Sequence, residues 1–431
     1  MKKLLLKKSV LSWALYDWAN SAFATTVMAG FFPVFYSALS SDLNAQDSQF
    51  WFNMTLAGSS ILVAICAPLL GAIADRVGGR KKFLVTFAMV GVLMTAGLAW
   101  VHAGMWWVGL ILYGFGTIGF SGANIFYDSM IVDVSGEDEF DIVSAYGYAM
   151  GYIGGGLLFA LNVMMVTKPA LFGLADAGSA VAASFLSVAV WWAVFTVPLL
   201  RGVKETPTDN QASAGQAIRE GMSQLVHTFR EVRKLKVLLI FLVGYWLYID
   251  AVNTVIKTAV FFGDRVLNLP QEALVTALLV TQFVAFPAAL FFGWLGKKIG
   301  PRPAILIGLA VYIGALFYAW RWLDTGADFY KLAIAIGLVQ GGVQSLSRSL
   351  YARLIPKSKT AEFFGFFNMV GKFAAIIGPL LMAMVPIVIT GADERDSILS
   401  LTLLFVIGGF LLWKVDVEAG AQAALEMDKE F

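Results

Sequence analysis

Two short segments of this chain carry the same set of polar side chains within apolar sequence. They are Asp17–Ser21 (DWANS) and Asp250–Thr254 (DAVNT). Because residues i, i+3 and i+4 share one face of a helix, each segment places a carboxylate, an amide and a hydroxyl on one stripe. A charge in the middle of a bilayer costs about 2.5–3.5 kcal/mol or more, so we expect it where it handles a substrate or an ion. Its repetition predicts two related halves around a shared central site, as in secondary transporters.

The composition places these stripes in a membrane. The chain has 431 residues, of which 59% are hydrophobic and 14% charged, and its mean hydropathy is +0.75. Soluble proteins carry about 25% charged residues. The net charge of +2 argues against a nucleic-acid partner. The single cysteine, Cys66, excludes a disulfide framework, and two histidines leave little material for a transition-metal site.

Twelve apolar stretches are long enough to cross a bilayer. They lie at 10–38, 51–73, 82–101, 105–131, 142–166, 179–200, 237–262, 272–295, 303–322, 329–351, 362–389 and 397–414. They predict an all-α polytopic membrane protein of about twelve transmembrane helices. The start of the chain lacks a cleavage motif and Asp17 interrupts its apolar stretch, so we interpret it as a retained first helix.

The longest polar stretch divides these spans into six and six. We expect an N-terminal bundle at 1–200, a cytoplasmic linker at 201–236, and a C-terminal bundle with a short cytoplasmic tail at 237–431. Apolar residues at helical spacing in the second part of the linker predict an amphipathic helix on the membrane surface, with a solvated linker helix as the alternative. Lysine and arginine gather before the first span, in the linker and after spans 2, 8 and 10, which predicts that both termini are cytoplasmic.

A second repeat follows spans 2 and 8. The segments Gly71–Arg80 (GAIADRVGGR) and Gly293–Arg302 (GWLGKKIGPR) share glycines, aliphatic positions and the final arginine. Glycine permits a tight turn between closely packed helices. Two registered repeats therefore predict two six-helix halves.

These motifs resemble a known superfamily. GAIADRVGGRKK resembles the loop 2–3 signature of the major facilitator superfamily, with one extra glycine before the basic cluster. WALYDWANSAF, QGGVQSLSRS and EFFGFFNMVGKFAAIIGP resemble its vacuole-effluxer-like branch, the "unknown major facilitator" family, which includes autophagy-linked vacuolar amino-acid effluxers. The resemblance covers nearly the whole chain. It implies two pseudo-symmetric bundles (the MFS fold) around a central cavity that is open to one side at a time and lined by helices 1, 4, 7 and 10.

Ionisable residues within the spans fall mostly on those helices. The candidate substrate- or ion-binding residues are Asp17, Asn20, Asp250, Asn253, Lys257, Gln344, Arg348 and Lys372. A cavity of mixed sign suits a zwitterion such as an amino acid, and a buried carboxylate, Asp17 or Asp250, can carry a proton. The alternatives are that Asp17 pairs with Arg348 or Lys372, or Asp250 with Lys257, only to hold the bundles together. Asn20 and Asn253 could likewise bond across helices.

The loop between helices 4 and 5 is acidic, against the positive-inside trend. By pseudo-symmetry we expect its carboxylates to meet loop 8–9 in a cross-bundle latch, and Asp75 to meet the N-terminus of helix 11, where the helix dipole favours an anion. A solvated acidic loop is the alternative. The candidate gating residues are Asp75, Arg76, Asp128, Glu137, Asp138, Glu139, Asp141, Lys297, Lys298 and Arg302.

The sequence thus predicts a secondary active transporter that moves a small polar solute by alternating access. We expect a monomer without cofactor or metal in the inner membrane of a bacterium, coupled to H+ or Na+. Neither an ATP-binding GxxxxGK[ST] motif nor an HExxH motif occurs, which argues against a pump and an intramembrane enzyme. The alternatives are an exporter of amphiphilic or lipid-like compounds, and a receptor or scaffold that keeps the fold without transport.

Overall fold

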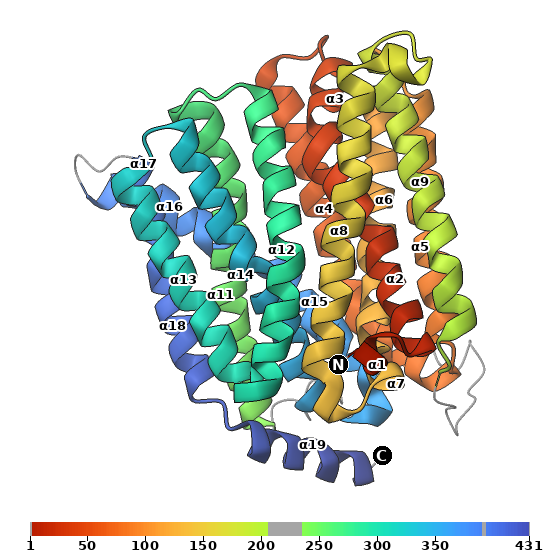
Figure 1. The fold of residues 1–431 in the computed structure, drawn as a ribbon, viewed down its shortest axis with the longest axis vertical. Helices are drawn as coiled ribbons and strands as arrows, with labels where there is room; N and C mark the ends of the chain where they lie inside the picture. The colour runs from red at the N-terminus through yellow and green to blue at the C-terminus, as the bar shows by residue number, and fades with distance from the viewer. Residues whose placement is uncertain (1, 206–234, 390–393, 431) are drawn as a thin grey trace.

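The computed structural model describes residues 2–205, 235–389 and 394–430. Within these ranges the chain is built from helices, and no strand occurs. Figure 1 shows the long helices standing side by side with both termini at the same end. We call this end the terminal end and the opposite one the distal end. The amphipathic helix predicted in the linker falls at 206–234, outside the described residues.

The N-terminal bundle has six spanning helices in the expected order. The first combines α2 (Lys8–Ala22), the π-helical η1 (Phe23–Phe31) and α3 (Phe32–Leu39), after a short α1 (Lys2–Leu5). The other five are α4 (Ala45–Val77), α5 (Arg80–Gly97), α6 (Trp106–Ser129), α8 (Phe140–Thr167) and α9 (Ala177–Gly202). The four-residue α7 (Ile131–Val134) and the short η3 (Glu137–Glu139) make the turn between α6 and α8.

The C-terminal bundle repeats this plan. Its first four helices are α11 (Lys236–Phe261), α12 (Gln271–Ile299), α13 (Pro301–Trp322) and α14 (Gly326–Arg353). The fifth is broken into α15 (Thr360–Phe373) and α16 (Ile377–Val388), and the sixth into α17 (Glu394–Leu399) and α18 (Leu401–Trp413). The predicted twelve-helix, two-bundle fold is therefore confirmed.

One of these helices is more polar than the rest. Within the described residues, eleven helical stretches are long and apolar enough to cross a membrane, and α14 is not among them. It is 28 residues long but carries Gln340, Gln344 and Arg348 besides several serines. These side chains are tolerated because α14 packs between α12, α13 and α8, so that protein covers them.

The two glycine repeats hold the bundles together at the terminal end. A Cβ atom on Gly71 of α4 would lie 2.1 Å from the carbonyl oxygen of Ala361 in α15. A Cβ atom on Gly293 of α12 would lie 2.5 Å from the Cβ atom of Ala145 in α8. Both contacts cross between bundles and allow no larger residue. The repeated glycine sequence thus lies at two equivalent helix contacts, α4 with α15 and α12 with α8.

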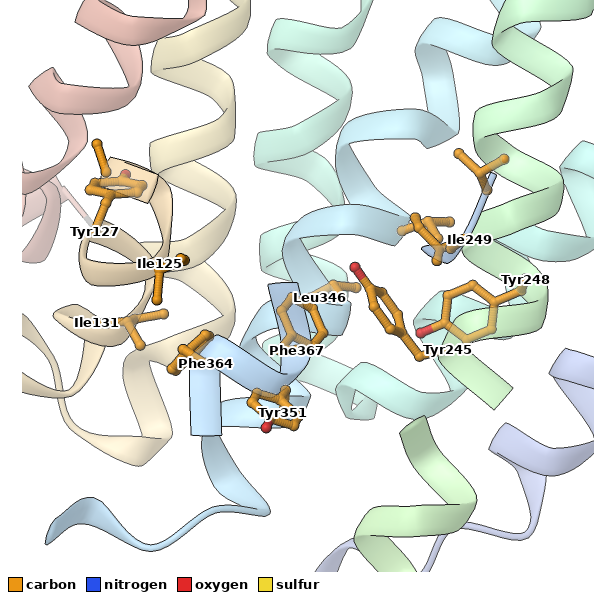
Figure 2. Packing of buried hydrophobic residues seen from close by; sticks show 14 of the residues in the cluster. Ile125, Tyr127, Ile131, Tyr245, Tyr248, Ile249, Leu346, Tyr351, Phe364 and Phe367 are labelled. Atoms are coloured by element: carbon orange, nitrogen blue, oxygen red, sulfur yellow. The ribbon is translucent and has the colours of Figure 1, made fainter. Parts of the chain in front are cut away.

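Aromatic side chains fill the terminal half of the C-terminal bundle. Figure 2 shows Tyr245 and Tyr248 of α11 near Phe367 of α15 and Tyr351 of α14. The ring of Phe367 stacks on Tyr245 and on Tyr351, with centroids 4.3 and 4.7 Å apart. Such pairs contribute about 0.5–1.5 kcal/mol each beyond their buried area. They fix α15, which also packs on α4 of the other bundle.

The C-terminal segment is a helix, where a short tail was expected. Helix α19 (Val417–Glu430) buries Gly420, Ala424 and Met427, which lie on one face at helical spacing. Near its end, Asp428 accepts hydrogen bonds from the backbone N–H groups of Lys357 and Ser358, at 2.8 and 3.0 Å. The tail therefore binds the loop between α14 and α15.

Candidate functional site

Arg348 of α14 reaches from the C-terminal bundle into the N-terminal bundle. Its side chain is only 2% exposed. Nη1 lies 2.8 Å from Oδ1 of Asp128 on α6 and 3.7 Å from Oδ2 of Asp17 on α2. Nε and Nη2 donate to the Oγ and the carbonyl oxygen of Ser144 on α8, each at 2.9 Å. Four helices from both bundles thus converge on one guanidinium group, and all three of its nitrogens make contacts.

Aromatic rings enclose the same guanidinium group. Its carbon lies 4.5 Å from the ring centroid of Tyr148, 4.8 Å from that of Trp13 and 5.4 Å from that of Tyr127. These distances suit cation–π attraction. Tyr127 also donates its hydroxyl to Oδ2 of Asp17 at 2.7 Å. We call Asp17, Tyr127, Asp128, Ser144 and Arg348 the central cluster.

Neither Ser144 nor the three aromatic residues were predicted from the sequence. Helical spacing could have found Trp13, which lies four residues before Asp17 and shares its helix face. Tyr148 lies four residues after Ser144, but nothing in the sequence singles out that serine. The sequence could not show that these faces meet around Arg348, because that depends on how the two bundles dock.

Amide side chains surround the central cluster. Asn20 donates to Oδ1 of Asn124 at 2.6 Å, and Asn368 donates to Oδ2 of Asp128 at 3.4 Å. The hydroxyl of Tyr152 donates to Oε1 of Gln344 at 3.4 Å, across the bundle interface. Asn20 therefore bonds across helices, which was one of the two expectations for it.

Asp250 is bound by residues other than those of the central cluster, although the repeated stripe predicted that it faces a shared central site. It is fully buried and accepts the backbone N–H groups of Ile376, Ile377 and Gly378 at 2.9–3.2 Å. These groups begin α16, so the carboxylate caps the second half of the broken helix. Asn253 donates to the carbonyl oxygen of Ala374 at 2.9 Å, within the same break.

The two copies of the stripe therefore contact equivalent helices. A Cβ atom on Gly147 of α8 would lie 2.8 Å from Oδ2 of Asp17, and one on Gly378 of α16 would lie 2.7 Å from Oδ1 of Asp250. Each stripe thus faces the fifth helix of its own bundle. Of the two fifth helices, only that of the C-terminal bundle is broken. There the backbone N–H groups at the start of α16 bind the carboxylate of Asp250.

Two lysines complete the central region. Lys372, in the last turn of α15, donates to the Oγ of Ser121 on α6 at 2.7 Å. Lys257 of α11 is exposed and lies four residues, or about one helical turn, after Asn253, which donates to Ala374 beyond the end of α15. Within the described residues neither lysine forms an ion pair with a carboxylate, in contrast to Arg348.

The acidic loop does cross between bundles, but with partners other than those expected. Asp141 binds Arg353, with Oδ1 2.8 Å from Nη1 and Oδ2 3.0 Å from Nη2. Glu137 lies 2.6 Å from Nζ of Lys357. The latch therefore joins the start of α8 to the end of α14, because the first turn of α8 lies beside that helix end.

The expected basic partners in loop 8–9 have other contacts. Lys297 is exposed, and Lys298 lies 5.1 Å from the ring centroid of Trp294. Arg302 donates to the carbonyl oxygen of Val415 at 2.7 Å. Asp138 is exposed, and Glu139 accepts the N–H of Gly136. The prediction that loop 8–9 supplies the basic half of the latch is wrong within the described residues.

Asp75 lies where pseudo-symmetry predicted it. Its two carboxylate oxygens accept the backbone N–H groups of Ala361 and Glu362 at 3.2 and 2.8 Å, in the first turn of α15. Arg76 is the next residue along α4 and is half-buried. Nearby, Arg80 binds Asp133 at 3.0 Å. The terminal end is thus closed by a helix cap and by the latch.

The distal end carries an apolar hollow of about 460 Å³ between α4 and α6. Trp51, Met54, Trp107, Ile111 and Phe115 line it, and each is at least 47% exposed. Ile118 is also part of the lining and lies three residues before Ser121, on the same side of α6. The hollow therefore ends about one helical turn from the Lys372–Ser121 contact.

The two bundles and the charged centre between them define a transporter of the major facilitator class. The fold is similar to the MFS proton:xylose symporter XylE, with a TM-score of 0.68 and 14% identity over 94% of both chains. It is equally similar to the human organic anion transporter MFSD10, with a TM-score of 0.68 and 15% identity over 95% of this chain and 99% of that one.

Sequence comparison defines the family within this class. The family described as "Vacuole effluxer Atg22 like" matches residues 51–139 and 133–425. "Uncharacterized MFS-type transporter YxiO" of Bacillus subtilis (strain 168) is 36% identical over 97% of both chains. Autophagy-related protein 22 of Eremothecium gossypii is 22% identical over 88% of this chain and 85% of its own. The chain belongs to the Atg22-like family of MFS-type transporters, and its relatives are transporters and not enzymes.

Proposed function

We propose that this protein is a secondary active transporter that moves a small zwitterionic solute, such as an amino acid, by alternating access. The observation that carries the proposal is the central cluster, in which Arg348 of one bundle binds Asp17 and Asp128 of the other. Two carboxylates face one guanidinium group there. The remaining negative charge suits a proton or the ammonium group of a solute.

The cluster also supports a coupling mechanism. Breaking a buried ion pair by removing one charge costs about 3–5 kcal/mol, because the other charge is left unpaired. A proton on Asp17 or Asp128 would reduce the attraction of the N-terminal bundle for Arg348. Protonation would thereby favour separation of the bundles at their terminal end, where the Asp75 cap and the Asp141–Arg353 latch also have to open.

We infer that the terminal end faces the cytoplasm. Lys7, Lys8, Arg76, Arg80 and Lys81 lie there, beside Lys357 of the other bundle. In this orientation the described structure is closed toward the cytoplasm. We place the protein in the membrane of a bacterium.

Reconstitution into proteoliposomes tests the proposal. Uptake and counterflow of a panel of radiolabelled L-amino acids are measured with an H+ gradient, with a Na+ gradient and with neither. We expect an H+ gradient to drive net transport of at least one of them, and Asp17→Asn to abolish the response to that gradient. Asp42→Asn, in an exposed loop, is the matched control. Unchanged gradient-driven uptake by Asp17→Asn would remove the cluster from coupling.

The apolar hollow at the distal end supports a second candidate, an exporter of amphiphilic compounds. Its tryptophan and phenylalanine side chains suit an apolar tail, and it ends near the cation of Lys372. Competition experiments separate the two candidates. If a long-chain fatty acid inhibits amino-acid counterflow only non-competitively, the amino acid is favoured as the transported solute. Gradient-driven extrusion of the fatty acid itself favours the second candidate.

A further inference from the structure

The charges of the central region are divided between two places. In the central cluster Arg348 is enclosed by two carboxylates, a serine and three aromatic rings, so its donors are already occupied. Lys372 contacts only the neutral hydroxyl of Ser121 in the described structure. Another cation, Lys257, lies one helical turn along α11 from Asn253, which contacts Ala374 just after Lys372. One place is therefore negative and the other positive.

The break in the fifth helix explains how an unpaired ammonium group is held at Lys372. Helix α15 ends at Phe373, so Lys372 lies in its last turn, where the helix dipole favours a cation. The N–H groups that begin α16 are satisfied by Asp250. Asp250 therefore neither compensates Lys372 nor leaves an anion-binding helix terminus beside it.

Contacts along helix α6 show how far the central cluster lies from Lys372. Ser121 touches Lys372 and Asp128 touches Arg348, and they are seven residues apart on one helix face. At 1.5 Å per residue this is about 10 Å. In an α-amino acid the ammonium nitrogen and the carboxyl carbon are about 2.5 Å apart. Hydrogen bonds of about 2.8 Å at both ends extend this to about 8 Å, which is about 2 Å less than the rise along α6, and the charged side chains at the two ends have to span that difference.

We propose that Lys372, with Ser121 and Lys257, forms the carboxylate subsite of the transporter, while the Asp17–Asp128 side of the central cluster receives the ammonium group. This assignment rests on the proposed transport of a zwitterion and orients that solute along α6. Asn124, paired with Asn20, lies between the two ends. Arg348 positions the carboxylates and does not bind the solute.

Binding measurements on the purified full chain test this subsite. Thermal stability in detergent is recorded with L-amino acids, with their carboxamides, which lack the carboxylate, and with the corresponding monocarboxylic acids, which lack the ammonium group. A ligand that binds the folded state raises the melting temperature by mass action. For the wild-type protein we expect carboxamides to bind at least tenfold more weakly than amino acids.

The lysine variants should change this preference. We expect Lys372→Met to bind an amino acid and its carboxamide equally, Lys372→Arg to keep the preference, and Lys257→Met to reduce it several-fold. Lys168→Met, an exposed lysine at the distal end of α8, should behave as wild type. If Lys372→Met does not fold, Lys257→Met and Lys372→Arg still decide the question. The subsite is contradicted if Lys257→Met keeps the full preference for amino acids over carboxamides and Lys372→Arg loses it.

The outcomes separate this inference from the proposed function. If Lys372→Met prefers amino acids over carboxamides by the wild-type margin, the subsite is overturned while amino-acid transport stands. If only monocarboxylic acids stabilise the wild-type protein, and Lys372→Met removes this effect, the anion subsite stands and the zwitterionic solute is wrong. If neither class stabilises the wild-type protein, the subsite is also overturned.

Discussion

At the scale of single residues, Arg348 and Lys372 are cations in one region with opposite surroundings. Arg348 contacts side chains of three helices in the other bundle, whereas Lys372 contacts one hydroxyl group. A planar guanidinium group can serve several acceptors at once, and an ammonium group cannot do so in the same geometry. This difference is the reason to treat Arg348 as a residue that holds the bundles together and to propose Lys372 as a solute ligand.

Replacing Arg348 should therefore reduce stability more than affinity. We expect Arg348→Gln to lower the free energy of unfolding by about 3–5 kcal/mol, since Asp17 and Asp128 lose their buried counter-ion. Arg348→Lys should recover only part of this loss. Thermal melting in detergent measures the effect. The double variant Asp128→Asn/Arg348→Gln should have a higher melting temperature than Arg348→Gln alone. A normal melting temperature with weakened amino-acid binding would instead make Arg348 a solute ligand.

Asp250 should behave as a helix cap. We expect Asp250→Ala to destabilise the protein by about 1–3 kcal/mol, because the buried N–H groups that begin α16 lose their acceptor. Asp250→Asn keeps one carbonyl oxygen and should lose less. Both variants should retain H+-driven uptake in proportion to the amount of folded protein. An Asp250→Asn variant that melts normally but has lost its response to the H+ gradient would contradict the capping role.

At the scale of elements, the closed terminal end depends on glycine at two helix crossings. Gly71→Ala would place a methyl group against the backbone of α15. Because backbone cannot yield as a flexible side chain does, we expect the variant to favour a state in which α4 and α15 are apart. Distances between spin labels on loop 2–3 and loop 10–11 measure this population.

The same helix offers a control for that experiment. Gly58 also lies within α4, but a Cβ atom there would meet nothing within 4 Å. Gly58→Ala should leave the distance distribution unchanged, and Gly293→Ala should widen the equivalent distance between α12 and α8. Identical distributions for Gly71→Ala and Gly58→Ala would show that the glycine contact does not control closure.

At the scale of the whole molecule, the Asp141–Arg353 latch is expected to bias the equilibrium between states. Arg353→Asp places three acidic groups together with Asp141 and Glu137 and should shift the protein toward opening at the terminal end. The swap Asp141→Arg/Arg353→Asp should restore part of the closed population. Cysteine accessibility at the start of α15 reports the shift. If the single variant and the swap give the same accessibility, the latch has no such role.

The sequence predicted the fold better than it predicted the contacts. Apolar length predicted the spans, because it is a property of neighbouring residues. The glycine repeats predicted tight turns, whereas the close approach of Gly71 and Gly293 to the other bundle depends on how the bundles dock. Asp17 and Arg348 do meet, as the alternative of a pair between bundles predicted, and Asp128, expected at the gate, joins them. Asp250 caps α16 instead of joining the central cluster, and Lys297 is exposed instead of meeting the acidic loop. The break between α15 and α16, and the position of the end of α14, arise from docking of whole helices, which residue spacing does not encode.

The polarity of α14 bears on how the protein is made. A segment that leaves the ribosome enters the bilayer by itself only when its own side chains prefer lipid to water, and α14 falls short of the apolar character of the other spans. Its long contacts with α12 and α13 offer an alternative. Helix α14 would enter the membrane together with α13 as a hairpin, and the N-terminal bundle, which is made first, would supply Asp128, Ser144 and Tyr152 as partners of Arg348 and Gln344. The residues that serve the mature centre would thus make co-translational insertion cooperative.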